Sequence, residues 1–140
     1  MTHDSLETRL AVFRENLRRL EEIPQTTFEE FAADFRNLDS ALHRLQTSIQ
    51  ALIDVASFAC AEQGLATPST SRGLLERLEE AGQLPPGSTA RFGPIFGFRN
   101  RVVHLYERVD ASIVYRVLRE ERQDLADLMD LLLAVLSEDV

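Results

Sequence analysis

The chain has 140 residues, of which 44% are hydrophobic, so we expect one domain, residues 1–140, with a modest buried core. It carries 15 Lys+Arg against 23 Asp+Glu, and the resulting net charge of −8 argues against a nonspecific nucleic-acid binder. No apolar run is long enough for a signal peptide or a membrane span, so we expect a cytoplasmic protein without membrane association. The single cysteine, Cys60, lies in an apolar stretch and is expected to be a buried thiol.

The positive charge is concentrated in one segment of the chain. Four arginines and one glutamate between Arg91 and Arg108 give this segment a charge of +3, which leaves −11 for the other residues. We therefore expect a local basic site on an otherwise acidic body.

The first half of the chain has the spacing of amphipathic helices. Apolar residues recur at three- and four-residue steps over residues 4–23, which predicts a helix that ends at Pro24. Thr27 is expected to cap a short helical turn. The same spacing over residues 38–64 predicts one long helix, or two helices joined by a kink.

Two further helices follow. A turn over residues 67–71 supplies capping side chains for a short helix that stops near Gly82. After a Pro-Pro-Gly break, Ser88 or Thr89 can cap the next main helix, whose first half is weakened by two glycines and a proline within residues 93–97.

A final helix completes the predicted architecture. Asp110 is a strong cap for a helix over residues 111–135, where apolar residues form a wide stripe. No segment has strand alternation with hairpin turns. The sequence therefore predicts an all-α fold, an up-and-down bundle of four or five helices.

The stretch from Gly97 to Tyr106 is polar where a regular helix would repeat its core stripe. RNA cleavage without a metal ion needs a base for the 2′-hydroxyl proton and a cation for the charge that builds on the scissile phosphate. His104 suits the first task because its ordinary pKa is near the working pH. Arg99 suits the second through a fixed charge and paired donors. On this pattern alone, an arginine and a histidine that merely form salt bridges on the surface are the commoner outcome.

Helical geometry separates these two candidates. Arg99 and His104 are five positions apart, so they stand about 140° from each other around a helix axis. Asn100 and Arg101 share a face with His104 and are candidate supporting residues. A long arginine can bend around the helix, or a second subunit can bring the complementary group. This spacing favours a composite site across a twofold interface.

The residues from Gly97 to Tyr106, in sequence GFRNRVVHLY, resemble the R-x4-H-x-Y motif of HepT-like toxins in the HEPN superfamily. The polar residue that this superfamily favours directly after the arginine is Asn100. Other segments also resemble the family and occur in its order. Before the motif these are the long helix with its internal aspartate (44–54), a loop (64–68) and a short helix (78–82), and after it the start of the last helix (114–115). The resemblance spans roughly residues 6–133.

This resemblance implies a helical bundle that forms a homodimer and cleaves RNA with Arg99 and His104, without metal or cofactor. It implies the toxin of a toxin–antitoxin pair, whose partner is a minimal nucleotidyltransferase antitoxin that silences it by transferring AMP to Tyr106. Added phosphate and bulk would block the place where substrate phosphate must bind. One departure is Leu105, which stands where the family commonly has glycine.

Asp54 has two interpretations of equal weight. This carboxylate among apolar neighbours can point into the cleft and orient His104 or pair with Arg99. It can equally form a salt bridge inside the bundle.

Two other classes of function stay open at this stage. The first is a non-catalytic HEPN module that binds a nucleotide or the partner nucleotidyltransferase, with Arg99 as a phosphate clamp. The second is a helical interaction protein whose motif builds the dimer interface. RNA binding without product formation indicates the first, and a dimer weakened by His104→Ala without a growth phenotype indicates the second.

Overall fold

The computed structural model describes residues 2–104 and 110–137, with the backbone alone at residues 3 and 102–104. Within these ranges all regular structure is helical, which confirms the all-α prediction. The elements are α1 (His3–Glu22), α2 (Phe28–Ala32), α3 (Phe35–Glu62), α4 (Ser71–Glu80), α5 (Ser88–His104), α6 (Ala111–Arg116), the π-helical segment η2 (Val117–Glu121) and α7 (Arg122–Ser137). Within the same ranges, no helix combines the length and apolar character that crossing a bilayer requires.

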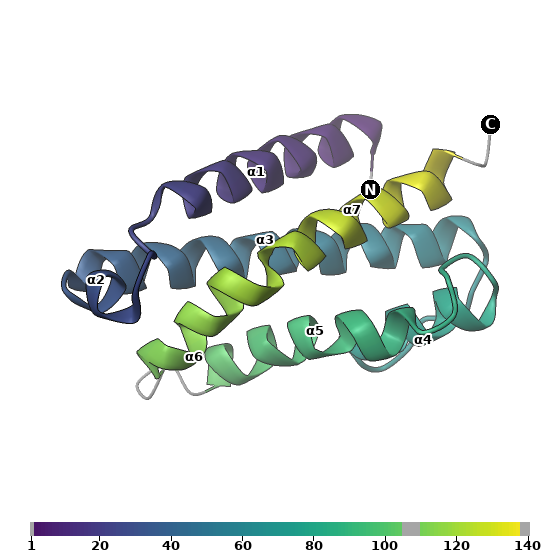
Figure 1. Cartoon of the computed structure of the whole chain (residues 1–140). Helices are drawn as coiled ribbons and strands as arrows, with labels where there is room; N and C mark the ends of the chain where they lie inside the picture. Colours follow the sequence, from purple (N-terminus) through teal and green to yellow (C-terminus); the bar gives the residue numbers. More distant parts are fainter. Residues whose placement is uncertain (1, 105–109, 138–140) are drawn as a thin grey trace.

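The long helices alternate in direction, as an up-and-down bundle requires (Figure 1). Helix α3 runs antiparallel to both α1 and α5, and the run from α6 to α7 returns beside them in the direction of α3 (Figure 1). The short helices α2 and α4 lie near opposite ends of the bundle, within the connections between long helices (Figure 1). The predicted bundle topology is confirmed.

Several helices begin at a side chain that satisfies a free backbone N–H. Thr27 accepts a hydrogen bond from the Glu30 amide at 3.1 Å, and Asp110 accepts one from the Ser112 amide at 2.8 Å. Both were predicted caps, and the bonds from Ser112 hold the pKa of Asp110 below its ordinary value. The long segment after α2 is one helix, α3, which begins at residue 35 behind an Asp34 cap.

The last predicted helix is not a regular α-helix along its whole length. It contains the π-helical segment η2 between α6 and α7, which the apolar spacing did not predict. A π-turn accommodates one extra residue in the helix, so the stripes before and after it are out of phase by about 100°. Val117 and Leu118 of η2 are nevertheless buried, because the segment packs into the core on this shifted register.

The hydrophobic core is centred on α3, which contacts α1, α4, α5, α6 and α7. Its buried residues are Ala41, Leu45, Ser48, Ile49, Ala51, Leu52, Val55, Ala56, Ala59 and Cys60. Burial raises the pKa of the Cys60 thiol, in agreement with the buried position that the sequence predicts. Because several neighbours pack on α3, this helix fixes where α5 lies in the bundle.

The Glu79 carboxylate of α4 joins that helix to the start of α5. One oxygen accepts a hydrogen bond from the Thr89 amide at 2.7 Å, and the other accepts one from the Gly87 amide at 3.2 Å. Thr89 belongs to the first turn of α5 and Gly87 directly precedes it, and backbone N–H groups at this end have no partner within the helix. Glu79 therefore caps α5 from another helix, and the bonds lower the pKa of its carboxyl.

Glu79→Gln tests this junction. At about pH 7 we expect a lower free energy of unfolding than in the wild type, because a neutral amide accepts the two bonds more weakly than a carboxylate. The native pKa is lowered, so the contribution is complete above the ordinary value of about 4.3 and is lost as pH falls through the native pKa. Urea unfolding from about pH 7 to about pH 3 should show the difference between the two proteins shrinking with acid.

Glu80→Gln is the matched control, because the Glu80 side chain is 70% exposed one position further along the same helix. It should leave stability nearly unchanged at every pH. A deficit in Glu79→Gln that stayed constant down to the acid end of the series would contradict the proposed capping role.

Candidate functional site

The candidate site is built on the second half of α5. The buried apolar side chains of this helix are those of Phe92, Ile95, Phe96 and Phe98, which are 2% exposed or less among the described residues. Arg99 comes three positions after Phe96 on the same face and is half-buried. Within the described residues, Arg99 forms no hydrogen bond or ion pair. A cation therefore replaces an apolar side chain where the core stripe would continue, as the sequence indicates.

The helical backbone extends without a break from Arg99 to His104, the last residue of α5. The two positions therefore stand about 140° apart around the helix axis, as predicted. The His104 side chain lies outside the described residues, and so does the whole of Tyr106. The structure thus gives the helical register of the predicted base and cation, and no geometry for the tyrosine.

Asn100 and Arg101 lie on a different side of α5, in a groove between this helix and the start of α4. Both are exposed, and the groove has a volume of about 580 Å³. The Asn100 amide lies 3.5 Å from the Ser71 hydroxyl of α4, at the outer limit of a hydrogen bond. Arg72 also lines the groove. Sequence analysis did not single out Arg72, because only the packing of α4 on α5 brings it against Gly93 and into the groove that Arg101 also lines.

Arg91 has a structural task that the charge count could not reveal. Its Nη2 lies 2.7 Å from an Asp124 oxygen and 2.6 Å from an Asp127 oxygen, both on α7. Its guanidinium carbon lies 4.6 Å from the centroid of the Phe92 ring. The bonds from Asp124 and Asp127 raise the pKa of Arg91. The charge of Arg91 is therefore neutralised by two aspartates, and the residue joins α5 to α7. The prediction that Arg91 contributes to the basic site was wrong.

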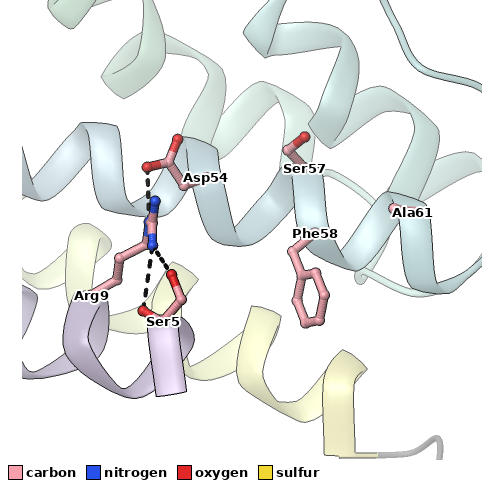
Figure 2. Close-up of a pocket in the computed structure, with 6 residues that line it drawn as sticks. All are labelled: Ser5, Arg9, Asp54, Ser57, Phe58 and Ala61. Atoms are coloured by element: carbon pink, nitrogen blue, oxygen red, sulfur yellow. Dashed lines mark hydrogen bonds and ion pairs between the residues drawn. The ribbon is translucent and has the colours of Figure 1, made fainter. Parts of the chain in front are cut away.

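Asp54 pairs with α1, as Figure 2 shows. One of its oxygens lies 3.2 Å from Nε of Arg9, and the other accepts a hydrogen bond from the Gln50 amide at 2.8 Å. The Arg9 guanidinium also donates to the hydroxyl and the carbonyl of Ser5 (Figure 2). The structure supports the second interpretation of Asp54, a salt bridge within the bundle, since both carboxylate oxygens already have partners other than Arg99.

Glu121 is a half-buried carboxylate that sequence analysis did not single out. It is the last residue of η2, and burial raises its pKa. The Arg116 guanidinium partly opposes that effect, and Arg101 of α5 also lowers the pKa. Glu121 therefore lies within electrostatic range of Arg101, one of the candidate supporting residues. No three His, Cys, Asp or Glu side chains in the described ranges stand close enough together to hold a metal ion.

Comparison with known proteins gives consistent matches over nearly the whole chain. A family model described as Ribonuclease HepT-like matches residues 13–132. The mRNA nuclease HepT of Shewanella oneidensis is 24% identical over 132 residues, which cover 94% of this chain and 98% of that protein.

Solved structures of toxin–antitoxin complexes share the fold. The tri-AMPylated HEPN toxin of Shewanella oneidensis in complex with the MNT antitoxin matches with a TM-score of 0.81 and 24% identity, over 95% of this chain and 99% of that chain. A crystal structure of a toxin–antitoxin with AMP-PNP matches with a TM-score of 0.80 and 23% identity, over 94% and 99%.

A double-mutant cycle tests the role of Asp54. Asp54→Asn and Arg9→Ala should each reduce the free energy of unfolding, with a coupling of about 0.5–1 kcal/mol between them, because the two side chains are 32% and 39% exposed. Urea unfolding of the two single variants and the double variant gives this coupling. Asp39→Asn, an exposed acid on the same helix, serves as the control and should not couple to Arg9→Ala. Zero coupling between Asp54 and Arg9 would contradict the structural role.

Proposed function

The chain belongs to the HepT-like ribonuclease family, and we propose that this toxin cleaves RNA without a metal ion through Arg99 and His104. The observation that carries the proposal is a half-buried cation, Arg99, in the core stripe of α5, five positions before a histidine on the same unbroken helix. The family match includes both positions. We further propose that the protein acts on RNA in the cytoplasm.

The chemistry assigns separate tasks to the two residues. His104, as a neutral imidazole, takes the proton of the 2′-hydroxyl while the 2′-oxygen attacks the adjacent phosphorus. The bond from phosphorus to the 5′-oxygen breaks, and this leaving oxygen takes a proton from water. Arg99 stabilises the charge that builds on the phosphate oxygens, because its guanidinium stays charged and offers two parallel donors. Asn100 and Arg101 support the site from the face that they share with position 104.

The angular separation of Arg99 and His104 supports a homodimer. Positions about 140° apart on one helix do not converge readily on one phosphate. A twofold axis near the motif would let one protomer's Arg99 face its partner's histidine, so that each site contains groups from both chains. Asp54 holds α1 to α3 in this proposal and does not contact the RNA.

The natural partner in our proposal is a nucleotidyltransferase antitoxin. A fold relative of this chain is a tri-AMPylated HEPN toxin in complex with an MNT antitoxin. Tyr106 stands two positions after His104, so AMP attached to its oxygen would bring phosphate charge next to the candidate base. The modification would compete with substrate phosphate for Arg99 and thereby silence the enzyme.

Cleavage by purified variants tests the catalytic proposal. In EDTA, the wild type should cleave single-stranded RNA, and Arg99→Ala and His104→Ala should each lose about 10²- to 10³-fold in kcat. Arg36→Ala, which removes a side chain that is 78% exposed on α3, should cleave at the wild-type rate. Equal rates for all four proteins, or cleavage that stops when EDTA is added, would overturn the proposal.

Growth of cells tests the antitoxin and the modified residue. Expression of the chain alone should stop growth, and co-expression of its nucleotidyltransferase should restore growth with a mass increase of one or more AMP units. Tyr106→Phe should remain toxic in the presence of the transferase, because the residue that accepts AMP is gone while Arg99 and His104 remain. Rescue of Tyr106→Phe to the wild-type extent would show that Tyr106 is not the site of silencing.

A further inference from the structure

The groove between α4 and α5 combines positive charge with an absence of acids. Arg72 of α4 and Arg101 of α5 line it, and none of its described lining residues is Asp or Glu, in a chain that has 23 acidic residues. Other surface hollows in the described part of the chain combine arginines with an acid, namely Glu22 with Arg19, Asp54 with Arg9, and Glu120 with Arg116 and Arg119.

Glycines of α5 form the open floor of this groove. Gly93, Gly97 and Arg101 are spaced four positions apart, so they lie along one face of the helix. A Cβ at position 97 would meet no atom within 4 Å, which shows that the space above this residue is open. A Cβ at position 93 would lie 3.1 Å from the guanidinium carbon of Arg72, so the missing side chain lets that cation lie against α5.

We propose that this groove binds backbone phosphates of single-stranded RNA that flank the scissile phosphate, with Arg72 and Arg101 as the phosphate-binding cations. The inference rests on the proposed ribonuclease function and gives its substrate a binding track. Gly93, against which Arg72 lies, and Arg101 are eight positions apart, so the two cations are anchored about 12 Å apart along the helix. At that separation, the two arginines can bind different phosphates of the same nucleic-acid strand.

The groove leads toward position 104, the candidate base, whereas Arg99 stands on another side of the same helix. His104 follows Arg101 by three positions and Asn100 by four, so the helical backbone brings position 104 onto the side of α5 that carries the groove. The volume of about 580 Å³ is in the range of pockets that hold a small molecule, and it suits one or two nucleotides of a single strand better than a duplex. Phosphates held here would continue into the site of cleavage.

The charge of Arg72 is available for a ligand at little cost. Its described ion pair is with Glu76 one turn further along α4, at 3.5 Å, with both side chains about half exposed (54% and 48%). Exposed pairs of this kind contribute little to stability, so a phosphate can replace Glu76 as the partner of Arg72. Arg101 is exposed and forms no ion pair with any residue in the described ranges, and Glu121 of η2 is an acid within electrostatic range of it.

Binding of an RNA that cannot be cleaved tests the groove separately from the chemistry. The probe is a single-stranded RNA of mixed sequence that is 2′-O-methylated throughout, titrated into the full-length protein at several salt concentrations. Arg72→Ala should weaken binding about tenfold at low salt, because a charge-assisted contact is lost. It should also reduce the slope of log Kd against log salt by about 0.7, as expected for one phosphate contact on a single strand.

Cleavable RNA gives a second readout for Arg72→Ala. KM should rise while kcat changes little, since Arg72 contacts flanking phosphate and not the reacting atoms. The matched control is Arg19→Ala, because Arg19 has a similarly exposed side chain (49%) and also pairs with a glutamate four positions away, on α1. This control should bind and cleave RNA as the wild type does.

Glycine variants test the groove without removing either arginine. Gly97→Glu should weaken RNA binding at least as much as Arg72→Ala, since it places a carboxylate between the two cations. Gly97→Ala should fold, because its Cβ has open space, and its RNA affinity should stay close to that of the wild type. Gly93→Ala keeps all charges and pushes the Arg72 guanidinium aside, so it should show a smaller loss in the same direction. Circular dichroism should confirm that each variant is folded.

The outcomes separate this inference from the ribonuclease proposal. Cleavage by the wild type together with the same RNA affinity in Arg72→Ala, Gly97→Glu and Arg19→Ala would overturn the groove and leave the ribonuclease intact. Absence of cleavage by the wild type would overturn the ribonuclease proposal. If the methylated RNA then still bound with the predicted ranking of variants, the groove would stand as an RNA-binding site.

Discussion

The packing of several helices around α3 is the constraint on which the remaining structure depends. A helix that contacts α1, α4, α5, α6 and α7 must be buried on much of its circumference. The sequence of α3 meets this demand with leucine, isoleucine and valine together with alanines, whose small side chains let neighbouring helices approach closely. Asp54 of α3 lies where this helix meets α1, and it binds both Gln50 of its own helix and Arg9 of α1.

Helix α5 has a low intrinsic helix propensity and depends on neighbouring helices for its stability. It contains Gly93, Pro94 and Gly97, residues that disfavour a helix interior. The structure compensates from outside, since Glu79 caps its first turn and Arg91 ties it to two aspartates of α7. The same residues that weaken α5 as a helix remove side chains from one of its faces and thereby open the groove beside the motif.

The sequence predicted the helices well because apolar periodicity and capping side chains are local signals. The helix over residues 4–23, the Thr27 and Asp110 caps and the register of Arg99 and His104 all follow from spacing along the chain. The π-helical segment was missed because the apolar residues Val117 and Leu118 continue the helical pattern into it, and spacing alone does not show that the backbone hydrogen bonds change there.

The partners of the charged residues could not be predicted from the sequence, for a different reason. Arg91 with Asp124, Asp54 with Arg9 and Arg72 with the face of α5 are contacts between residues at least 20 positions apart in sequence. No local pattern distinguishes an arginine that will be neutralised by a neighbouring helix from one that will face solvent. The four-residue spacing of Gly93, Gly97 and Arg101 is visible in the sequence. It indicates a groove only once α4 is known to pack beside this face of α5.

This segregation of charges explains how an acidic chain with a net charge of −8 can act on RNA. Glu79, Asp124 and Asp127 are engaged in holding helices together, where they cap α5 or neutralise Arg91. Arg99 and Arg101 in the second half of α5, and Arg72 against Gly93 of the same helix, have no such strong partner among the described residues. A site that depends on so few cations is also one that a few added phosphates can inactivate, which is the physical basis on which silencing by AMP transfer would work.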